Sequence, residues 1–175
     1  MGADHARILA SAVSNAAVVA VSEPDAARVA KILEVCTEAR AIADPLELIR
    51  AENVDAVLIA SPDSTHGKFV HACLDVAKPV LCEKPLAGSV EECLDIVRRE
   101  EKLDRRLVTV GYMRRFDPGY VEMKRKLRQG ELGAALVMHC IHRNVSSNPS
   151  TTGAMLIANS AVHEFDIARF VLGSE

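Results

Sequence analysis

The chain has no tryptophan, few aromatic residues and no strong excess of either charge. Aromatics make up 3% of its 175 residues, and 21 Lys and Arg stand against 24 Asp and Glu, for a formal charge of −3. A nucleic-acid-binding protein would carry a basic excess, which this composition lacks. No apolar run approaches the roughly 20 residues that cross a bilayer, and no basic stretch followed by an apolar one opens the chain. We therefore expect neither a nucleic-acid nor a membrane partner.

The five cysteines are scattered and never form a C-x-x-C pair. An odd number at irregular spacing is typical of reduced thiols in a cytoplasmic protein, where they pack as small hydrophobic side chains. A metal site would need clustered ligands, and the one candidate cluster is His139, Cys140 and His142. On a regular strand His139 and His142 point to opposite faces, so we expect no metal site.

Short apolar segments alternate with segments of helical periodicity along the first 110 residues. Strands alternating with longer helices indicate βαβ units, and so an α/β fold with a Rossmann-type, doubly wound parallel sheet. The apolar runs predict strands at 16–21, 39–43, 55–60, 79–82 and 107–110. The periodic segments predict helices at 4–13, 24–35, 45–51, 65–77 and 89–103, the last with an S-x-x-E start at Ser89.

The pattern changes after Gly111, where we place a domain boundary. The predicted domains are 1–111, a Rossmann-type domain that would bind a dinucleotide cofactor, and 112–175, the start of a second α/β domain. In the second domain the sequence predicts a basic helix at 118–129, a longer strand at 134–142, a polar loop at 144–152 and a helix at 160–172. Charged residues at 98–102 indicate an exposed, salt-bridged helix face.

The glycine-rich turn of a dinucleotide-binding fold is largely missing. Such a fold begins with a strand, a glycine-rich turn and a helix whose N-terminus holds the pyrophosphate. Here Met1 and Gly2 precede the first predicted helix directly, so Gly2 would be the last glycine of a G-x-G-x-x-G motif. The missing first strand is central in the strand order 3-2-1-4-5-6, so we expect two unpaired strand edges and a marginally folded chain.

Two polar segments follow predicted strands, at the sheet edge where open α/β sheets bind ligands. Glu23 can accept hydrogen bonds from an adenosine ribose and repel a 2′-phosphate, or it can stabilise the N-terminus of the next helix. Lys84, within Cys82-Glu83-Lys84-Pro85, can stabilise charge on a substrate oxygen, or it can be a solvated lysine at a strand end. Pro85 would fix the turn in a trans or a cis form.

Two further groups of polar residues lie beyond Gly111. Asn159, His163 and Asp166 have offsets of 0, 4 and 7, which place them on one face of a helix. His163 can take a proton near neutral pH, or it can be a core histidine that Asp166 satisfies. The Arg and Asn side chains of 111–117 and 142–144 suit a polyhydroxylated ligand, or they can form a surface ion-pair network.

Taken together, these segments resemble the Gfo/Idh/MocA family (glucose–fructose oxidoreductases and inositol dehydrogenases) along the whole chain, and most closely its inositol dehydrogenase branch. The E-K-P motif marks the family broadly, whereas G-Y-M-R-R-F-D, H-C-I-H-R-N and H-E-F-D point to the inositol branch. The matching stretches are VDAVLIASPDSTH (54–66), VLCEKPLA (80–87), LVTVGYMRRFDPGYV (107–121), HCIHRN (139–144) and VHEFDIARFVLG (162–173).

This resemblance implies an NAD-dependent enzyme, assembled as a homotetramer when intact, that oxidises the axial hydroxyl of myo-inositol to a ketone. Lys84 and His163 correspond to the catalytic lysine and histidine of the family. The residues implied to contact the cofactor are Gly2, Glu23, Ser61, Pro62, His66, Glu83 and Lys84. Those implied to lie in or near the pocket of the small polyhydroxylated substrate are Met113, Arg114, His142 and Asp166.

Two features depart from the family pattern. Family members are nearly twice as long, and Asn159 stands where their catalytic Asp is expected. Asn cannot carry the charge of a carboxylate or relay a proton. Two other functions therefore stay open: another sugar or cyclitol dehydrogenase of the same family, and an inactive Rossmann-like binding protein.

Overall fold

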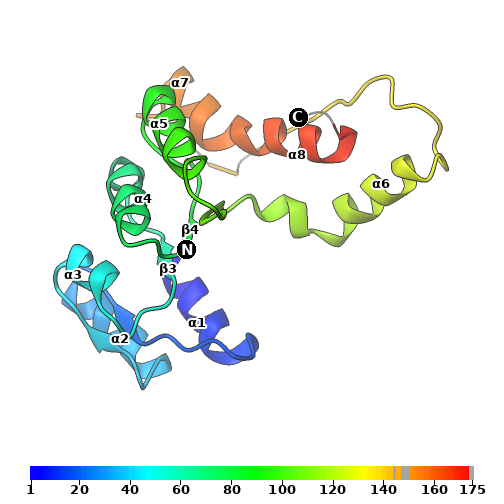
Figure 1. The fold of residues 1–175 in the computed structure, drawn as a ribbon. Helices are drawn as coiled ribbons and strands as arrows, with labels where there is room; N and C mark the ends of the chain where they lie inside the picture. The colour runs from blue at the N-terminus through cyan, green and yellow to red at the C-terminus, as the bar shows by residue number, and fades with distance from the viewer. Residues whose placement is uncertain (144, 147–149, 174–175) are drawn as a thin grey trace. The chain divides into compact units, whose positions relative to one another are not determined.

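The computed structural model describes residues 1–143, 145–146 and 150–173. The chain folds as two compact units, Met1–Val110 and Gly111–Glu175 (Figure 1). Helices and parallel strands alternate in the first unit, which confirms the predicted α/β class. Its elements are α1 (Gly2–Ala12), β1 (Ala20–Val21), α2 (Ala26–Val35), β2 (Arg40–Ala41), α3 (Pro45–Arg50), β3 (Val57–Ile59), η1 (Asp63–Thr65), α4 (His66–Asp75), β4 (Val80–Cys82), α5 (Val90–Glu100) and β5 (Val108–Val110).

The strands of this unit form two separate parallel sheets. One has the order β1-β2, with Ala20 opposite Arg40, and the other has the order β3-β4-β5, with Val57 opposite Val80 and Val80 opposite Val108. This arrangement matches a doubly wound sheet from which the central strand between β1 and β3 is missing. Among the described residues no strand joins the two sheets, as expected.

Two predicted strands are shorter and less buried than expected. The run 16–21 forms a strand only at Ala20–Val21, and Ala16 and Ala17 are exposed. The run 39–43 forms only Arg40–Ala41, which is exposed as well. A strand is buried on both faces only where other strands and helices flank it, and a sheet of two short strands offers little such cover.

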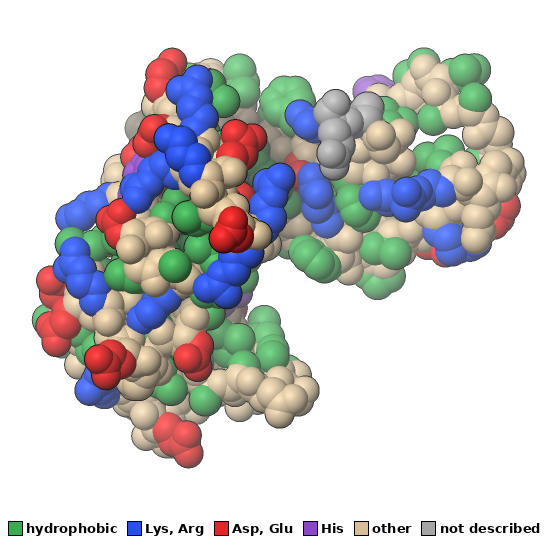
Figure 2. Space-filling model, viewed as in Figure 1, with side chains coloured by type: hydrophobic (Ala, Val, Ile, Leu, Met, Phe, Trp, Pro, Cys, Tyr) green, Lys and Arg blue, Asp and Glu red, His purple; other side chains and the backbone are tan. Residues whose placement is uncertain are grey.

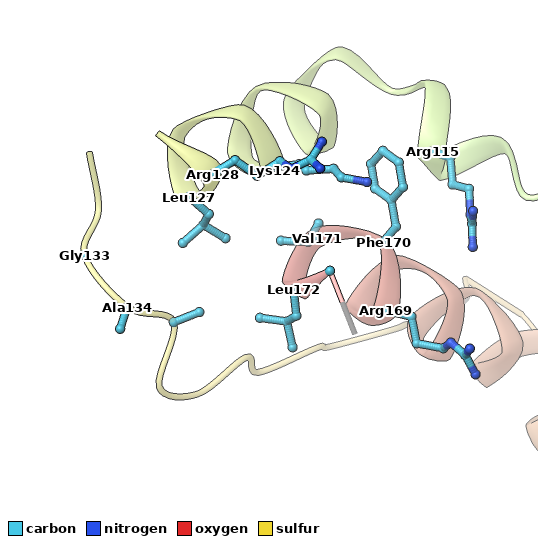
Figure 3. Close-up of a pocket in the computed structure, with 12 residues that line it drawn as sticks. Arg115, Lys124, Leu127, Arg128, Gly133, Ala134, Arg169, Phe170, Val171 and Leu172 are labelled. Carbon is cyan, nitrogen blue, oxygen red and sulfur yellow. The ribbon is translucent and has the colours of Figure 1, made fainter. Parts of the chain in front are cut away.

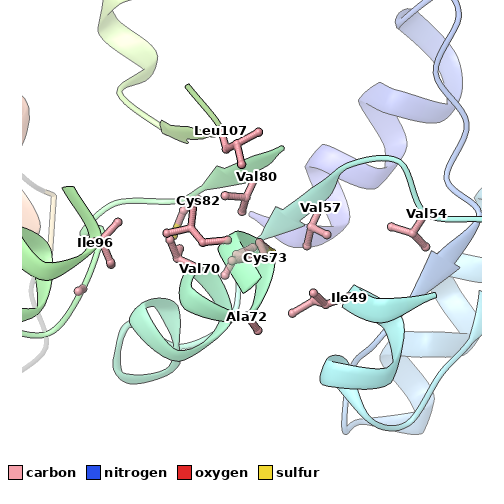
Figure 4. Packing of buried hydrophobic residues seen from close by; sticks show 13 residues of the cluster. Ile49, Val54, Val57, Val70, Ala72, Cys73, Val80, Cys82, Ile96 and Leu107 are labelled. Carbon is pink, nitrogen blue, oxygen red and sulfur yellow. The ribbon is translucent and has the colours of Figure 1, made fainter. Parts of the chain in front are cut away.

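The core of the first unit lies around β3 and β4, against which α4 packs (Figure 4). Val70 and Cys73 of α4 and Cys82 of β4 are fully buried. Ile49 from α3 and Ile96 from α5 extend this cluster to the neighbouring helices. The apolar residues from which β3 and β4 were predicted therefore form part of the core that stabilises the first unit.

Three predicted helix starts in this unit, those of α2, α3 and α5, are confirmed by side-chain caps. Asp25 accepts hydrogen bonds from the backbone N–H groups at the start of α2, and Asp44 does the same for α3. The Oγ of Ser89 accepts from the backbone N–H of Glu92 at 3.1 Å, as an S-x-x-E start requires. Local sequence thus decides where these helices begin.

Glu100 corrects the prediction of an exposed charged face at 98–102. Its side chain is buried, and its Oε1 accepts hydrogen bonds from the backbone N–H groups of Leu107 (2.7 Å) and Val108 (2.6 Å). These two N–H groups lie at the entry to β5, where backbone donors need an acceptor. The carboxylate of Glu100 therefore joins the end of α5 to the start of β5.

The second unit is largely helical. Its elements are η2 (Met113–Phe116), α6 (Pro118–Arg128), α7 (Gly153–Leu156), the π-helical η3 (Ile157–Ala161) and α8 (Val162–Leu172), and α6 packs against α8. The predicted helix at 160–172 is confirmed from Val162 onward. Residues 144 and 147–149 of the predicted polar loop lie outside the described part of the chain.

The predicted strand at 134–142 is wrong, since these residues form no regular element. A strand is held by backbone hydrogen bonds to a neighbouring strand, and no described residue of this unit supplies one. Leu136 and Val137 are accordingly 89% and 88% exposed.

Acidic and basic side chains are interspersed over the face of the first unit that Figure 2 shows. Within the part of the chain that the structure describes, no helix is both long enough and apolar enough to cross a membrane.

We expect Glu100→Ala to lower the free energy of unfolding by about 2–4 kcal/mol, because the buried N–H group of Leu107 and the partly buried N–H group of Val108 lose their acceptor. Urea denaturation at pH 7 measures this change. The matched control is Glu101→Ala at the exposed neighbouring position, which should stay within about 0.5 kcal/mol of the wild type. Equal effects of the two substitutions would show that the bonds of Glu100 contribute little.

Candidate active site

The register of β3 with β4 brings two predicted site segments to one edge of the sheet. Ile59 lies opposite Cys82, so Ser61–Pro62 and Glu83–Lys84 both follow the carboxyl ends of paired parallel strands. The backbone N–H of Glu83 donates to the carbonyl oxygen of Ile59 at 2.9 Å, which extends the pairing by one residue. The Lys84–Pro85 peptide bond is cis.

The N-terminus of α1 lies at the same edge. A Cβ atom added to Gly2 would sit 3.6 Å from the Cβ of Ala60, the residue that follows β3. The Nε2 of His5, in the first turns of α1, lies 2.7 Å from the Oε1 of Glu83. A helix N-terminus with a glycine, beside the carboxyl ends of parallel strands, is the place where this type of fold binds a pyrophosphate. The residues present thus fit a dinucleotide.

Glu23 follows β1 and is half-buried. Its Oε1 accepts a hydrogen bond from the backbone N–H of Asp25 at 3.1 Å and lies 3.9 Å from the Nη1 of Arg28. These contacts are the ones expected of an acidic residue that stabilises the start of α2. Both contacts are made by Oε1 of the carboxylate. This geometry is compatible with a hydrogen bond from an adenosine ribose to Glu23.

His66 is one of the residues that the family resemblance implies to contact the cofactor. It is only 1% exposed. Its Nδ1 lies 2.6 Å from the carbonyl oxygen of Pro85, and its Nε2 lies 2.9 Å from that of Ser61. The imidazole therefore sits between the segments that follow β3 and β4. No local feature of the sequence shows this, since the two carbonyl groups belong to different loops.

Two buried cysteines of this unit, Cys73 and Cys82, are unsuited to nucleophilic chemistry. Burial raises the pKa of Cys73 to about 12, and burial together with the negative charge of Glu83 raises the pKa of Cys82 to about 12. A thiol with this pKa has almost no thiolate at pH 7. Both therefore act as small core side chains, as predicted.

In the second unit, three polar residues from separate segments form one network. The Nη1 of Arg114 donates to Glu164, and the Nδ1 of His142 lies 3.1 Å from the Oε1 of Glu164. The Nη2 of Arg114 also lies 3.3 Å from the Nδ1 of His142. The structure thus brings together Arg114 and His142, which the sequence placed in the substrate pocket. Their shared partner Glu164 was missed, although it lies next to His163.

Glu164 titrates differently from an ordinary glutamate. Its burial alone would raise the pKa, but hydrogen bonds from Arg114 and His142 outweigh the burial, so the pKa of Glu164 is lowered. The carboxylate is therefore held in its charged form by its two basic neighbours.

Asp166 is buried on α8 and accepts a bidentate pair of bonds from Arg115. The distances are 2.9 Å from Nε to Oδ2 and 2.6 Å from Nη2 to Oδ1. A buried carboxylate requires such a partner, since an unpaired charge in the interior is costly. His163 is buried on the same helix.

Asn159 does not share a regular helix with these two residues, which corrects the prediction from the offsets 0, 4 and 7. It is half-buried in the π-helical η3, directly before α8. A π-helix pairs residue i with i+5, so the spacing rules of an α-helix do not apply across this junction. Short π-helical segments inside helices are frequent at functional sites.

The second unit also has a pocket between α6, α8 and residues 133–135 (Figure 3). Its walls include Phe170, with the Nζ of Lys124 at 3.6 Å and the Cζ of Arg115 at 5.6 Å from the ring centroid. None of the predicted substrate residues that the structure describes lines this pocket.

Residues 1–112 match the family GFO_IDH_MocA, described as an oxidoreductase family with an NAD-binding Rossmann fold. The chain belongs to this family. Over all 175 residues it is 50% identical to inositol 2-dehydrogenase 2 of Saccharopolyspora erythraea and 45% identical to inositol 2-dehydrogenase of Mycolicibacterium smegmatis, covering 52% and 51% of those proteins. The chain therefore spans about half the length of the curated relatives it matches.

A solved structure shows the same relationship. The crystal structure of myo-inositol dehydrogenase from Lactobacillus casei, in complex with NAD(H) and myo-inositol, matches 99% of this chain and 51% of that protein. The TM-score is 0.91 and the sequence identity is 31%. The resemblance to the Gfo/Idh/MocA family and the predicted Rossmann fold are confirmed.

Replacing Arg114 with Met should raise the pKa of Glu164, because the guanidinium is lost while the carboxylate stays partly buried. A 13C NMR titration of the carboxyl carbon measures this shift. Arg128→Met, at an exposed arginine of α6, should leave that pKa unchanged. If the pKa of Glu164 does not rise in the Arg114 variant, the ion pair with Arg114 does not cause the lowered pKa.

The same lowered pKa has a consequence for stability. The charged Glu164 stabilises the folded chain above the pKa that it has when unfolded, and this contribution is lost as the pH falls through the lower, folded pKa. Arg114→Met should therefore reduce the loss of stability between about pH 5 and pH 3.

Proposed function

We propose that this chain provides the NAD-binding domain and the first part of the substrate domain of a cyclitol dehydrogenase. Its reaction is the oxidation of a secondary hydroxyl to a ketone, with myo-inositol giving 2-keto-myo-inositol (scyllo-inosose). The observation that carries this proposal is Lys84 at the carboxyl edge of β4, beside the segment that follows β3, in a chain 50% identical to an inositol 2-dehydrogenase.

The groups proposed to hold the cofactor all belong to the first unit. The N-terminus of α1 at Gly2 faces the pyrophosphate, and Glu23 accepts from the adenosine ribose, which favours NAD over NADP. Ser61, Pro62 and Glu83 border the nicotinamide side. NAD⁺, when bound, supplies the acceptor for the hydride that leaves the substrate.

Lys84 and His163 are the proposed catalytic residues. The ammonium group of Lys84 donates a hydrogen bond to the substrate oxygen and stabilises the negative charge that develops there. The imidazole of His163 takes the hydroxyl proton as a general base. The C–H bond breaks with its electron pair as hydride, the O–H proton goes to His163, and the carbon–oxygen double bond forms, so atoms and electrons balance.

The proposed substrate contacts lie in the second unit. Arg114 and His142, held by Glu164, and Asp166, held by Arg115, carry donors and acceptors suited to several hydroxyl groups. Met113 is largely exposed and would border the same substrate. We propose a homotetramer as the assembled form, which light scattering tests.

The test uses a chimera in which these 175 residues replace the matched region of the 50% identical relative. Lys84→Met keeps the apolar stem of the side chain and removes its charge, so kcat for myo-inositol should fall by about 10²-fold or more. The affinity for NADH, measured by fluorescence titration, should change by less than about threefold. Lys68→Met, at an exposed lysine of α4, is the control and should match the unsubstituted chimera.

Two results would contradict the proposal. Wild-type kcat in Lys84→Met would remove this residue from the chemistry. NADH binding without turnover of any cyclitol or hexose by the unsubstituted chimera would favour an inactive binding protein, for which Asn159 is the supporting feature.

Asn159→Asp in the same chimera should raise kcat by about tenfold or more. A carboxylate shortly before His163 can orient the imidazole and stabilise its protonated form. Ser160→Asp is the matched control, since it adds the same charge one residue away in η3 and should give no gain. An unchanged kcat in Asn159→Asp, with robust turnover in the unsubstituted chimera, would show that Asn159 belongs to a different working relay.

A further inference from the structure

We propose that His66 and His5 are positioning residues that hold the Glu83–Pro85 segment from its two sides and thereby fix Lys84. The inference rests on the proposed function for its importance to turnover. The contacts that carry it do not depend on that function, because they are seen directly in the first unit.

His66 holds the segment at Pro85. Its Nδ1 lies 2.6 Å from the carbonyl oxygen of Pro85 and its Nε2 lies 2.9 Å from the carbonyl oxygen of Ser61. His66 is the first residue of α4, and Val70 and Cys73 of this helix are fully buried in the core. The ring therefore lies within hydrogen-bond distance of the residue after Lys84 and of the neighbouring loop, and it is carried by a helix that is anchored in the core.

His5 holds the segment at Glu83. Its Nε2 lies 2.7 Å from the Oε1 of Glu83, and the side chains of His5 and Glu83 are 26% and 13% exposed. The backbone N–H of Glu83 is also bonded to Ile59 of β3. The residue before Lys84 is thus tied both to the sheet and to α1.

Lys84 lies between these two held residues. A lysine side chain has a flexible four-carbon stem, so its ammonium group is placed well only if the backbone that carries it is fixed. A displacement of about 1 Å can cost a reaction 10²-fold in rate. Contacts that fix Glu83 and Pro85 therefore also restrict the position of the Lys84 backbone.

A direct contact of His66 with the cofactor fits the structure less well. The ring is 1% exposed, and both of its nitrogen atoms face protein carbonyl oxygens. Its polar atoms are thus engaged within the edge of the sheet. This separates His66 from the residues proposed to touch the dinucleotide.

The first experiment measures amine labelling of the 175-residue chain by mass spectrometry, with no cofactor and no substrate. His66→Leu and His5→Leu should each raise the acetylation rate of Lys84 by about threefold or more. Lys78 is the internal standard, because it is half-buried and its Nζ donates to the carbonyl oxygen of Ala51 at 2.6 Å. Its labelling should stay unchanged, since only general unfolding would expose it.

Conservative variants test the bonds themselves. His66→Asn keeps a donor near the position of Nδ1, and His5→Gln keeps one near Nε2, so both should return the Lys84 rate to near the wild-type value. The control is His71→Leu, at a histidine of α4 that pairs with Arg99 instead of Pro85. An equal rise at Lys78 and Lys84, or no rescue by Asn and Gln, would overturn the proposal.

The second experiment uses the chimera. His66→Leu should lower kcat about tenfold or more with the affinity for NADH within about threefold, because Lys84 is displaced while the cofactor contacts remain. A large loss of NADH affinity with unchanged kcat would make His66 a cofactor contact and overturn the inference. If the unsubstituted chimera has no activity, the proposed function fails, while the labelling rates still decide whether the two histidines fix Lys84.

Discussion

The parallel pairing of β3 with β4 is the interaction on which the first unit depends. Its register places Ile59 opposite Cys82, and this decides that the loops after both strands leave the sheet at one edge. The same strands carry the side chains around which α4 packs. The hydrophobic core and the proposed cofactor edge are therefore two consequences of one pairing, and a slip of one residue would disturb both.

The two units are stabilised in different ways. The first buries a contiguous apolar cluster, whereas the described part of the second has few buried apolar residues and relies on paired charges, as at Arg115–Asp166 and Arg114–Glu164. Buried carboxylates have to be paired, and a pair formed between distant segments also fixes their relative positions. In this way ion pairs place Arg114 and His142 beside α8.

Asn159 lies in the segment directly before the helix that carries His163, the proposed general base. An amide stands at the position where the resemblance predicts a catalytic carboxylate, in a π-helical segment directly before α8 and His163. An amide can donate and accept hydrogen bonds but cannot carry the charge that stabilises an imidazolium ion. The chemistry proposed for His163 therefore depends on what this single position supplies.

Features that arise from neighbouring residues could be predicted without the fold. Asp25, Asp44 and Ser89 set the starts of helices, and the runs at 55–60 and 79–82 predicted β3 and β4, because caps and periodicity act over a few residues. The motifs around Lys84 and His163 likewise sufficed to indicate the family.

Features that need a partner from elsewhere in the chain depend on the fold and could not be predicted. Glu100 is buried because β5 brings two N–H groups to it, and His66 lies between two carbonyl groups that are 5 and 19 residues away. The apolar residues of 134–142 had strand periodicity, but none of the described residues of the second unit supplies a neighbouring strand. Hydrogen bonds between distant segments are decided by the fold, and a local pattern cannot specify them.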